Sequence, residues 1–145
     1  MTSRTVRHCL QGCGIAEGVA EGIALVSHEP IAFNLGVDEQ TGIVVERGHE
    51  LEGQSIAGRV LVFPGGKGST ASSFSLLQLA SLGLAPAAIL NVQSDAILVA
   101  GAVLAGFPLV HDFTSGAMES IKSGDLLHID GSTGLVEVLE SDACN

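Results

Sequence analysis

The chain has 145 residues, of which 46% are hydrophobic and only 15% are charged, and sixteen acidic against six basic side chains leave a formal charge of −10. A chain this acidic gains little from counterion release on a polyphosphate, so nucleic-acid binding is not expected. Membrane insertion is not expected either, because no apolar run reaches the roughly 18 residues that cross a bilayer. The first residues lack the apolar core of a signal peptide, which favours the cytoplasm.

The low share of charge also bears on assembly. Few charged side chains on a small surface leave apolar area uncovered after folding, which favours a partner subunit or an oligomer. We expect one domain over residues 1–145, with residues 1–20 as an N-terminal segment of weaker pattern.

The first half of the chain alternates short apolar runs with turns, which is typical of strands. We expect strands at 5–10 and 22–27, with a glycine-rich stretch between them. Residues 37–45 indicate a loop that leads into a short strand, in which Gly42 takes a turn position of positive φ. Residues 48–55 indicate a polar loop.

The middle of the chain alternates strands with helices. The uninterrupted apolar run 59–64 predicts a strand buried on both faces, and a helix with one apolar stripe follows it. The members of that stripe are Phe74, Leu76, Leu77, Leu79, Ala80 and Leu82, and Gly83 is the expected C-cap. After this helix come a strand, a second helix and a short strand, at 87–92, about 95–105 and 107–110.

The end of the chain is predicted to hold a helical turn at 118–122 and a hairpin with strands 125–130 and 135–140. Strands that alternate with helices require a parallel sheet with right-handed crossovers. We therefore expect an α/β fold with a parallel central core and flanking antiparallel strands.

A glycine-rich turn joins the strand at 59–64 to the first helix. Its residues are Gly65, Gly66, Lys67, Gly68, Ser69 and Thr70. Backbone N–H groups at a helix N-terminus, a lysine charge and two hydroxyls suit a carboxylate or a phosphate. The spacing fits neither a Walker A loop nor a dinucleotide-binding fingerprint. The alternative is that the glycines only turn the chain and that Ser69 only caps the helix.

The histidines of the chain form no metal-ligand pair. They are His8, His28, His49, His111 and His128. His49 lies in a polar loop, and because loop residues often carry function we treat it as a candidate for the site. His128 alternates with apolar neighbours on the final hairpin, which predicts a position that faces solvent.

Acidic residues follow two of the predicted strands, where doubly wound sheets place ligand groups. These are Asp95 and Asp112, for which helix capping or turn formation is the alternative; Ser94 is a second candidate for the cap.

The three cysteines are Cys9, Cys13 and Cys144. The spacing of Cys9 and Cys13 resembles half of a metal site, but one pair cannot complete a zinc or iron–sulfur site. We expect the cysteines to be small buried side chains in a reducing compartment.

The glycine-rich turn and its surroundings resemble a known family. Residues 59–73 are similar to the signature of the aconitase X small subunit, also called the swivel domain. Further segments that fit the same family are residues 35–43, 48–53, 85–90 and 123–131, so the resemblance covers roughly residues 22–139.

The resemblance implies a swivelling β/β/α domain that closes over a large catalytic subunit, and this large subunit carries an iron–sulfur cluster. It implies the dehydration of a small hydroxy acid, which is cis-3-hydroxy-L-proline in bacterial members and (R)-5-phosphomevalonate in archaeal ones. We expect cis-3-hydroxy-L-proline as the substrate, because the sequence of residues 65–73 resembles that of the bacterial members. A lone serine is a poor base, so activity is expected only in the complex with the large subunit.

The resemblance also assigns roles to residues. It makes Ser69 the proton acceptor, and the substrate-binding residues that we expect beside it are Gly66, Lys67, Gly68, Thr70 and His49. Lys67 stands where many members have arginine, so charge is kept but bidentate binding of an anion is lost. The cluster ligands of the family lie on the large subunit, so the cysteines of this chain are not expected to bind metal.

Two other classes of protein compete with the dehydratase. A phosphohistidine carrier domain closes with a segment like residues 124–131, but it needs a histidine at the helix start, where Thr70, Ala71 and Ser72 stand. A non-catalytic assembly module is the second alternative.

Overall fold

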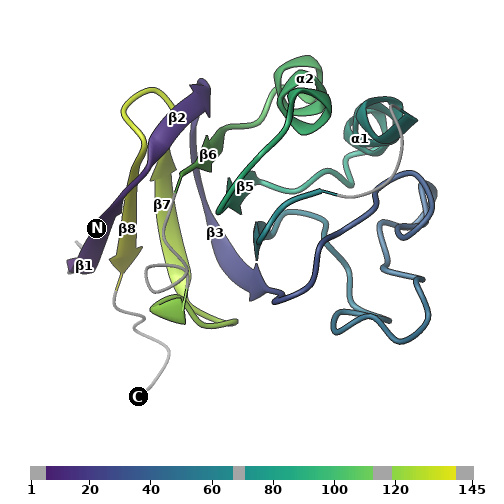
Figure 1. The fold of residues 1–145 in the computed structure, drawn as a ribbon, viewed down its shortest axis with the longest axis horizontal. Coiled ribbons are helices and arrows are strands. Elements are labelled where there is room, and N and C mark those ends of the chain that lie inside the picture. The colour runs from purple at the N-terminus through teal and green to yellow at the C-terminus, as the bar shows by residue number, and fades with distance from the viewer. Residues whose placement is uncertain (1–5, 67–70, 113–118, 140–145) are drawn as a thin grey trace.

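The computed structural model describes residues 6–66, 71–112 and 119–139 (Figure 1). The elements in these ranges are β1 (Val6–Gln11), β2 (Cys13–Ala16), β3 (Val19–Val26), β4 (Val60–Phe63), α1 (Ala71–Ser81), β5 (Ala88–Asn91), α2 (Ala96–Ala105), β6 (Leu109–His111), β7 (Leu126–Asp130) and β8 (Leu135–Leu139). The predicted strands and helices of the middle and end of the chain are therefore present, with boundaries shifted by up to two residues. The predicted helical turn at 118–122 lies partly outside the described residues.

The strands form one sheet in the order β1-β8-β7-β3-β4-β5-β6-β2. Neighbours from β3 to β6 pair in parallel, and the remaining neighbours pair antiparallel. The expected parallel core with flanking antiparallel strands is confirmed. The two helices lie side by side over this core (Figure 1).

The first two strands close the sheet on itself. Only Gly12 separates β1 from β2, yet these strands pair with opposite ends of the sheet, so the sheet must curl until its ends approach each other. The backbones that meet here leave no space for side chains, because a Cβ on Gly14 would overlap the carbonyl oxygen of Gly131. The prediction of a glycine-rich connection in this region was wrong, since its glycines are needed for close approach within strands.

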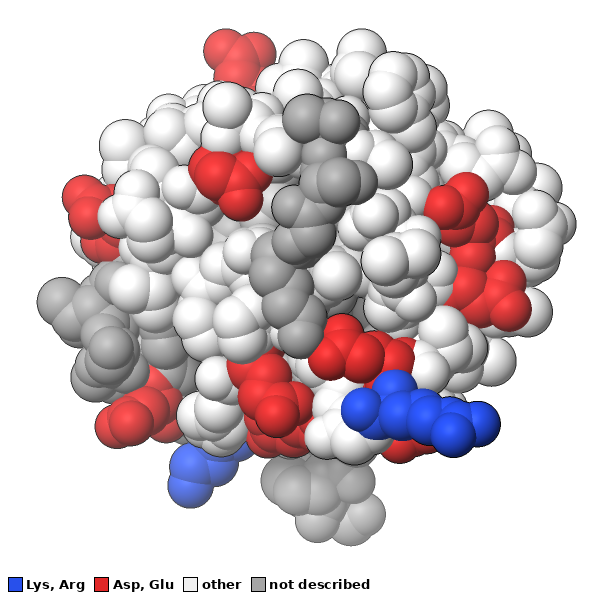
Figure 2. Space-filling view, turned by 45° about the vertical axis from the view of Figure 1, so that its right-hand side comes forward, with Lys and Arg blue, Asp and Glu red and all other residues white. Residues whose placement is uncertain are grey.

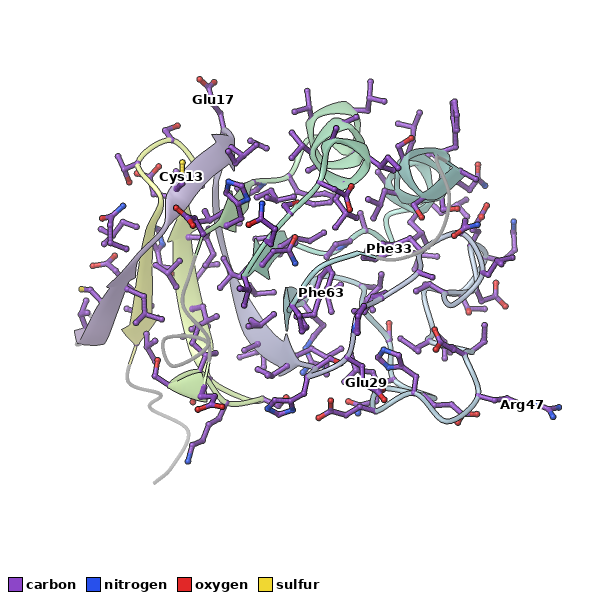
Figure 3. The ribbon with its side chains drawn as sticks, viewed as in Figure 1. Cys13, Glu17, Glu29, Phe33, Arg47 and Phe63 are labelled. Carbon is purple, nitrogen blue, oxygen red and sulfur yellow. The ribbon has the colours of Figure 1, made fainter. Side chains whose placement is uncertain are left out.

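Successive side chains of the central strands point to opposite faces of the sheet, and each face carries its own hydrophobic core. On β4, Leu61 and Phe63 belong to the core that lies under the helices, whereas Val60 and Val62 belong to the core inside the curled sheet. All four side chains are buried, as the apolar run predicted. The rings of Phe33 and Phe63 meet edge to face, with centroids 6.0 Å apart (Figure 3).

The long segment between β3 and β4 has little regular structure but contributes much of the core under the helices. Its pairing is limited to isolated bridges, such as the one between Val37 and Val44, so the short strand predicted at 37–45 is not formed. Gly42 has a φ of 74°, as the turn prediction required. The buried side chains of this segment include Ile31, Phe33, Val37, Val44, Leu51 and Ile56.

The helices differ from the prediction in which residues they bury. Of the six residues in the predicted stripe of α1, Leu76 and Leu79 are fully buried, whereas Phe74, Leu77 and Leu82 are exposed. A helix on a sheet buries a narrow face, and apolar residues beyond it stay at the surface. Gly83 has a φ of 74°, in keeping with the expected C-cap.

The cap of α2 is Asp95 rather than Ser94, because the Asp95 side chain accepts a hydrogen bond of 2.9 Å from the Leu98 N–H. Capping satisfies a backbone donor that has no partner within the helix. At the other end, Gly106 closes α2 in a left-handed conformation.

Candidate functional site

A cavity of about 420 Å³ lies where three parallel strands end. Its lining comes from the residues at the carboxyl ends of β3, β4 and β5 together with Glu119: Val26, Ser27, His28, Val62, Pro64, Val92 and Gln93. Ligands of open α/β sheets bind outside the carboxyl ends of the strands, so this is the position expected for a site. The glycine-rich turn starts at one wall of the cavity, directly after Pro64.

Glycines are required at the start of that turn because another backbone crosses it closely. A Cβ on Gly65 would lie 2.6 Å from the carbonyl oxygen of Gln93. The Gln93 N–H also donates to the Pro64 carbonyl over 3.1 Å, which fixes the two strand ends against each other. A Cβ on Gly66 would lie 2.9 Å from a methyl group of Leu98. Gly66, an expected substrate-binding residue, therefore sits beside the first turn of α2.

The other expected residues of the turn, Lys67, Gly68, Ser69 and Thr70, lie outside the described residues. Their roles stay predictions. The helix that follows them begins at Ala71, so the turn leads directly into the N-terminus of α1.

The first turns of α1 are tied to the long segment between β3 and β4. The Ser72 hydroxyl donates to Asn34 Oδ1 over 3.2 Å, and the Ser75 hydroxyl donates to Glu39 Oε2 over 2.6 Å. A hydrogen bond to a carboxylate is the stronger of these two types. These contacts hold the N-terminus of α1 in a fixed position relative to the cavity.

The imidazole of His49 is buried and bonded to backbone on both sides, which differs from the expected contact with substrate. Its Nε2 lies 2.9 Å from the Pro30 carbonyl oxygen, and its Nδ1 accepts from the Leu51 N–H over 3.0 Å. These two contacts define the tautomer that carries its proton on Nε2. In the described structure His49 is a positioning residue for the segment that follows β3, and it does not line the cavity.

A different histidine reaches the cavity. His28 lies two residues beyond the end of β3 and lines the cavity wall. Its N–H donates to Glu50 Oε1 over 2.7 Å, and its Nδ1 lies 3.1 Å from Glu50 Oε2. A carboxylate that contacts one ring nitrogen orients the imidazole, so that the other ring nitrogen can contact substrate or solvent. The sequence signal that could have identified His28 is its place at the end of a buried strand.

The hydrogen bond from the His28 N–H is the main cause that lowers the pKa of Glu50 below its ordinary value, and burial opposes it. The Glu50 N–H in turn donates to Glu29 Oε2 over 2.7 Å. Glu29, His28 and Glu50 thus join the segment after β3 to the loop at 48–52.

Replacing Glu50 by glutamine is expected to make stability less sensitive to acid. Because the folded pKa of Glu50 is lowered, its ionised form stabilises the fold above its ordinary pKa of 4.5, and this contribution is lost as pH falls through the folded value. Between about pH 7 and about pH 3, the free energy of unfolding of the wild type should fall by up to about 1 kcal/mol more than that of the variant. The effect is limited to this size because Glu50 is exposed to solvent, which weakens its interactions. Urea midpoints measure this difference. Glu17→Gln, at an exposed acid beyond β2, controls for the removed charge.

Two polar side-chain atoms lie buried at the end of β5. Asn91 donates from Nδ2 to the Phe63 carbonyl over 3.0 Å, while its Oδ1 and the Ser94 hydroxyl have no partner among the described residues. Buried polar atoms normally have hydrogen-bond partners. Both atoms belong to the strand end that borders the cavity.

The two acidic candidates take structural positions. Asp95 caps α2, as described above. Asp112 follows β6 with a φ of 69°, and its N–H donates to the Val92 carbonyl over 3.1 Å. Aspartate tolerates this left-handed conformation better than most residues, so Asp112 closes β6 with a turn.

The described residues do not fit an iron–sulfur cluster. Cys9 and Cys13 are exposed, which corrects the expectation that they are buried. They lie on β1 and β2, which pair with opposite ends of the sheet, and Figure 3 shows Cys13 far from Glu29 and Phe63. Among the described ranges no three histidine, cysteine or acidic side chains gather as metal ligands. Cys144 lies outside those ranges, and the location of the cluster on a large subunit stays a prediction.

Comparison with known proteins identifies the family. Residues 9–138 match the model of the aconitase X swivel domain. The chain belongs to this family. The resemblance to an aconitase X swivel domain, expected over roughly residues 22–139, is confirmed, and the match extends it to residue 9. It favours the dehydratase over the carrier domain that was the alternative.

Relatives of this swivel domain are similar along nearly their whole length. The phosphomevalonate dehydratase small subunit of Methanocella arvoryzae is 44% identical over 89% of this chain and 98% of its own. That of Methanosarcina acetivorans is 46% identical over 90% and 91%, and that of Archaeoglobus fulgidus is 47% identical over 87% and 95%. The expected enzyme class, a small subunit of an aconitase X-type dehydratase, is confirmed.

Solved structures share the fold of this swivel domain. A chain of Thermococcus kodakaraensis aconitase X in its holo-form matches with a TM-score of 0.87 and 39% identity, over 92% of this chain and 99% of its own. A UPF0107 protein solved in solution matches with a TM-score of 0.85 and 44% identity, over 92% and 100%. The expected fold class is confirmed. In the described part of the chain, no helix is long and apolar enough to span a membrane.

Proposed function

We propose that this chain is the small subunit of a dehydratase that acts on phosphomevalonate. The observation that carries the proposal is the 44–47% identity to phosphomevalonate dehydratase small subunits over nearly the full length of both chains. The relatives favour this substrate over cis-3-hydroxy-L-proline, which was expected from the sequence of residues 65–73.

The chemistry of the glycine-rich turn is compatible with a phosphorylated hydroxy acid. The turn ends at the N-terminus of α1, where backbone N–H groups and the helix dipole favour an anion. Lys67 adds a positive charge to this position. A phosphate has more negative charge than the carboxylate of a zwitterionic amino acid, so its electrostatic interaction with a helix N-terminus and a lysine is stronger.

We assign the proton-removing half of the elimination to this chain. Ser69, as an alkoxide, would take the proton from the carbon beside the carboxylate, and the electron pair of that C–H bond would form the double bond. The helix N-terminus and Lys67 would stabilise the alkoxide in a site closed to water. Departure of the hydroxyl group is assigned to the large subunit.

The experiment that tests this function is reconstitution with the large subunit from the same organism. We expect the complex to dehydrate phosphomevalonate with a kcat/KM at least about 100-fold above that for cis-3-hydroxy-L-proline, because groups built to pair with a phosphate stay unpaired with the amino acid. The isolated chain should be inactive. A preference for the amino acid, or turnover by the chain alone, would contradict the proposal.

A further inference from the structure

The outer faces of α1 and α2 form an apolar surface without charge. Neither helix contains an acidic or basic residue. Phe74 is 70% exposed, Val103 is 60% exposed and Leu104 is 58% exposed, although each is a large apolar side chain. Scattered apolar residues are common on protein surfaces, but a group of them on adjacent elements marks an interaction site.

These exposed residues lie on two helices that pack against each other. The helices touch at Gly101, where a Cβ would lie 2.6 Å from a methyl group of Leu76. Beside α2 the surface continues into a groove of about 450 Å³. The groove is lined by Ile15, Ala16, Glu17, Ala102, Val103, Gly106 and Phe107.

The apolar surface begins beside the glycine-rich turn. Phe74 lies in the first turn of α1, immediately after the glycine-rich turn. Because Ser72 and Ser75 fix this end of the helix to the long segment after β3, the surface and the cavity keep one relative position. A partner that covers this surface would therefore also lie close to the start of α1, into which the glycine-rich turn leads.

Charge distinguishes between the possible occupants. Figure 2 shows most of the acidic side chains around the lower and right margins of the visible face, with others at the top and on the left. The chain as a whole has a formal charge of −10. A second copy would bring two acidic margins together, and like charges across an interface are unfavourable. A partner with basic groups around an apolar centre would be complementary.

We propose that the outer face of α1 and α2 is the docking surface for the large subunit of the dehydratase. This inference rests on the proposed function, because it takes the partner from the assignment as a small subunit. The contacting surface of the large subunit is apolar at its centre, opposite Phe74 and Leu104, and basic at its rim. Docking here brings the large subunit close to the N-terminus of α1.

The test compares the affinity of purified large subunit for single variants of the full-length small subunit. Phe74→Gln, Leu77→Gln and Leu104→Gln are each expected to raise Kd by roughly 10-fold or more, the scale of a central interface residue. Val6→Gln is the matched control, because Val6 and Leu77 are both 39% exposed while β1 lies away from the helices (Figure 1). Unchanged Tm values for the isolated variants confirm that they fold.

Each outcome decides the question. Selective loss of affinity in the helix variants supports the proposal, and an equal effect of Val6→Gln overturns it. If the isolated chain forms a dimer that Phe74→Gln dissociates while affinity for the large subunit is unchanged, the surface binds a second copy instead. Binding is measured without substrate, so a wrong substrate assignment leaves this result intact.

Discussion

Replacing Ser69 by alanine is expected to lower kcat of the reconstituted dehydratase by about 100-fold or more, the scale of a lost acid–base group. The proposed role of Ser69 is to remove a proton, and alanine has no group that can do so. Binding of substrate should change much less than kcat, since the backbone N–H groups and Lys67 remain. Assembly with the large subunit should also be unaffected, because Phe74, Leu77 and Leu104 of the proposed docking surface are unchanged in this variant.

The measurement is steady-state turnover of phosphomevalonate by complexes of equal composition. Ser81→Ala is the matched control, since it also removes one hydroxyl. Ser81 is the last residue of α1, and its hydroxyl donates to the Gln78 carbonyl. The complex of this variant should keep the activity of the wild type. Full activity of the Ser69→Ala complex would show that the proton acceptor lies elsewhere, and loss of assembly would point to a structural role for this hydroxyl.

The parallel core was predictable from sequence because its signals are local. The apolar runs that form β4 and β5 are buried on both faces. A strand without alternating polar residues is typical of the centre of a parallel sheet, where both faces are covered. The position of the glycine-rich turn followed from the same pattern, since a turn between a parallel strand and its helix must lie at the carboxyl edge of the sheet.

The closure of the sheet was not predictable in the same way. The segment of β1 and β2 is rich in glycine, which usually weakens a strand, and only the approach of the turn after β7 explains why glycine is needed. Such a contact joins residues more than one hundred positions apart, so no local pattern reports it.

The choice between two histidines shows the same limit within the site. His49 lies in a polar loop, yet its ring is buried against the backbone of Pro30 and Leu51. His28 reaches the cavity because β3 ends just before it and Glu50 comes from another loop to hold it. Burial of a loop side chain depends on the path of the whole segment between β3 and β4, which has too little regular structure to be read from periodicity.

Replacing Gly131 by alanine is expected to cost about 3 kcal/mol or more in the free energy of unfolding. A Cβ at this position would overlap the carbonyl oxygen of Ala16 and lie 2.8 Å from the Cβ of Pro108. Both neighbours are held by β2 and β6, so neither can move aside without opening the sheet. For a domain of this size the loss corresponds to a decrease in Tm of roughly 6–12 °C.

Gly53→Ala is the matched control for removal of a glycine. Gly53 has a φ of 86° and open space around it, so its substitution tests the cost of backbone conformation without steric overlap. That cost is expected to be about 1 kcal/mol. Thermal or urea unfolding of both variants gives the comparison. If Gly131→Ala is no more destabilising than Gly53→Ala, the closely packed corner formed by β1, β2 and the β7–β8 turn is not what holds the ends of the sheet together.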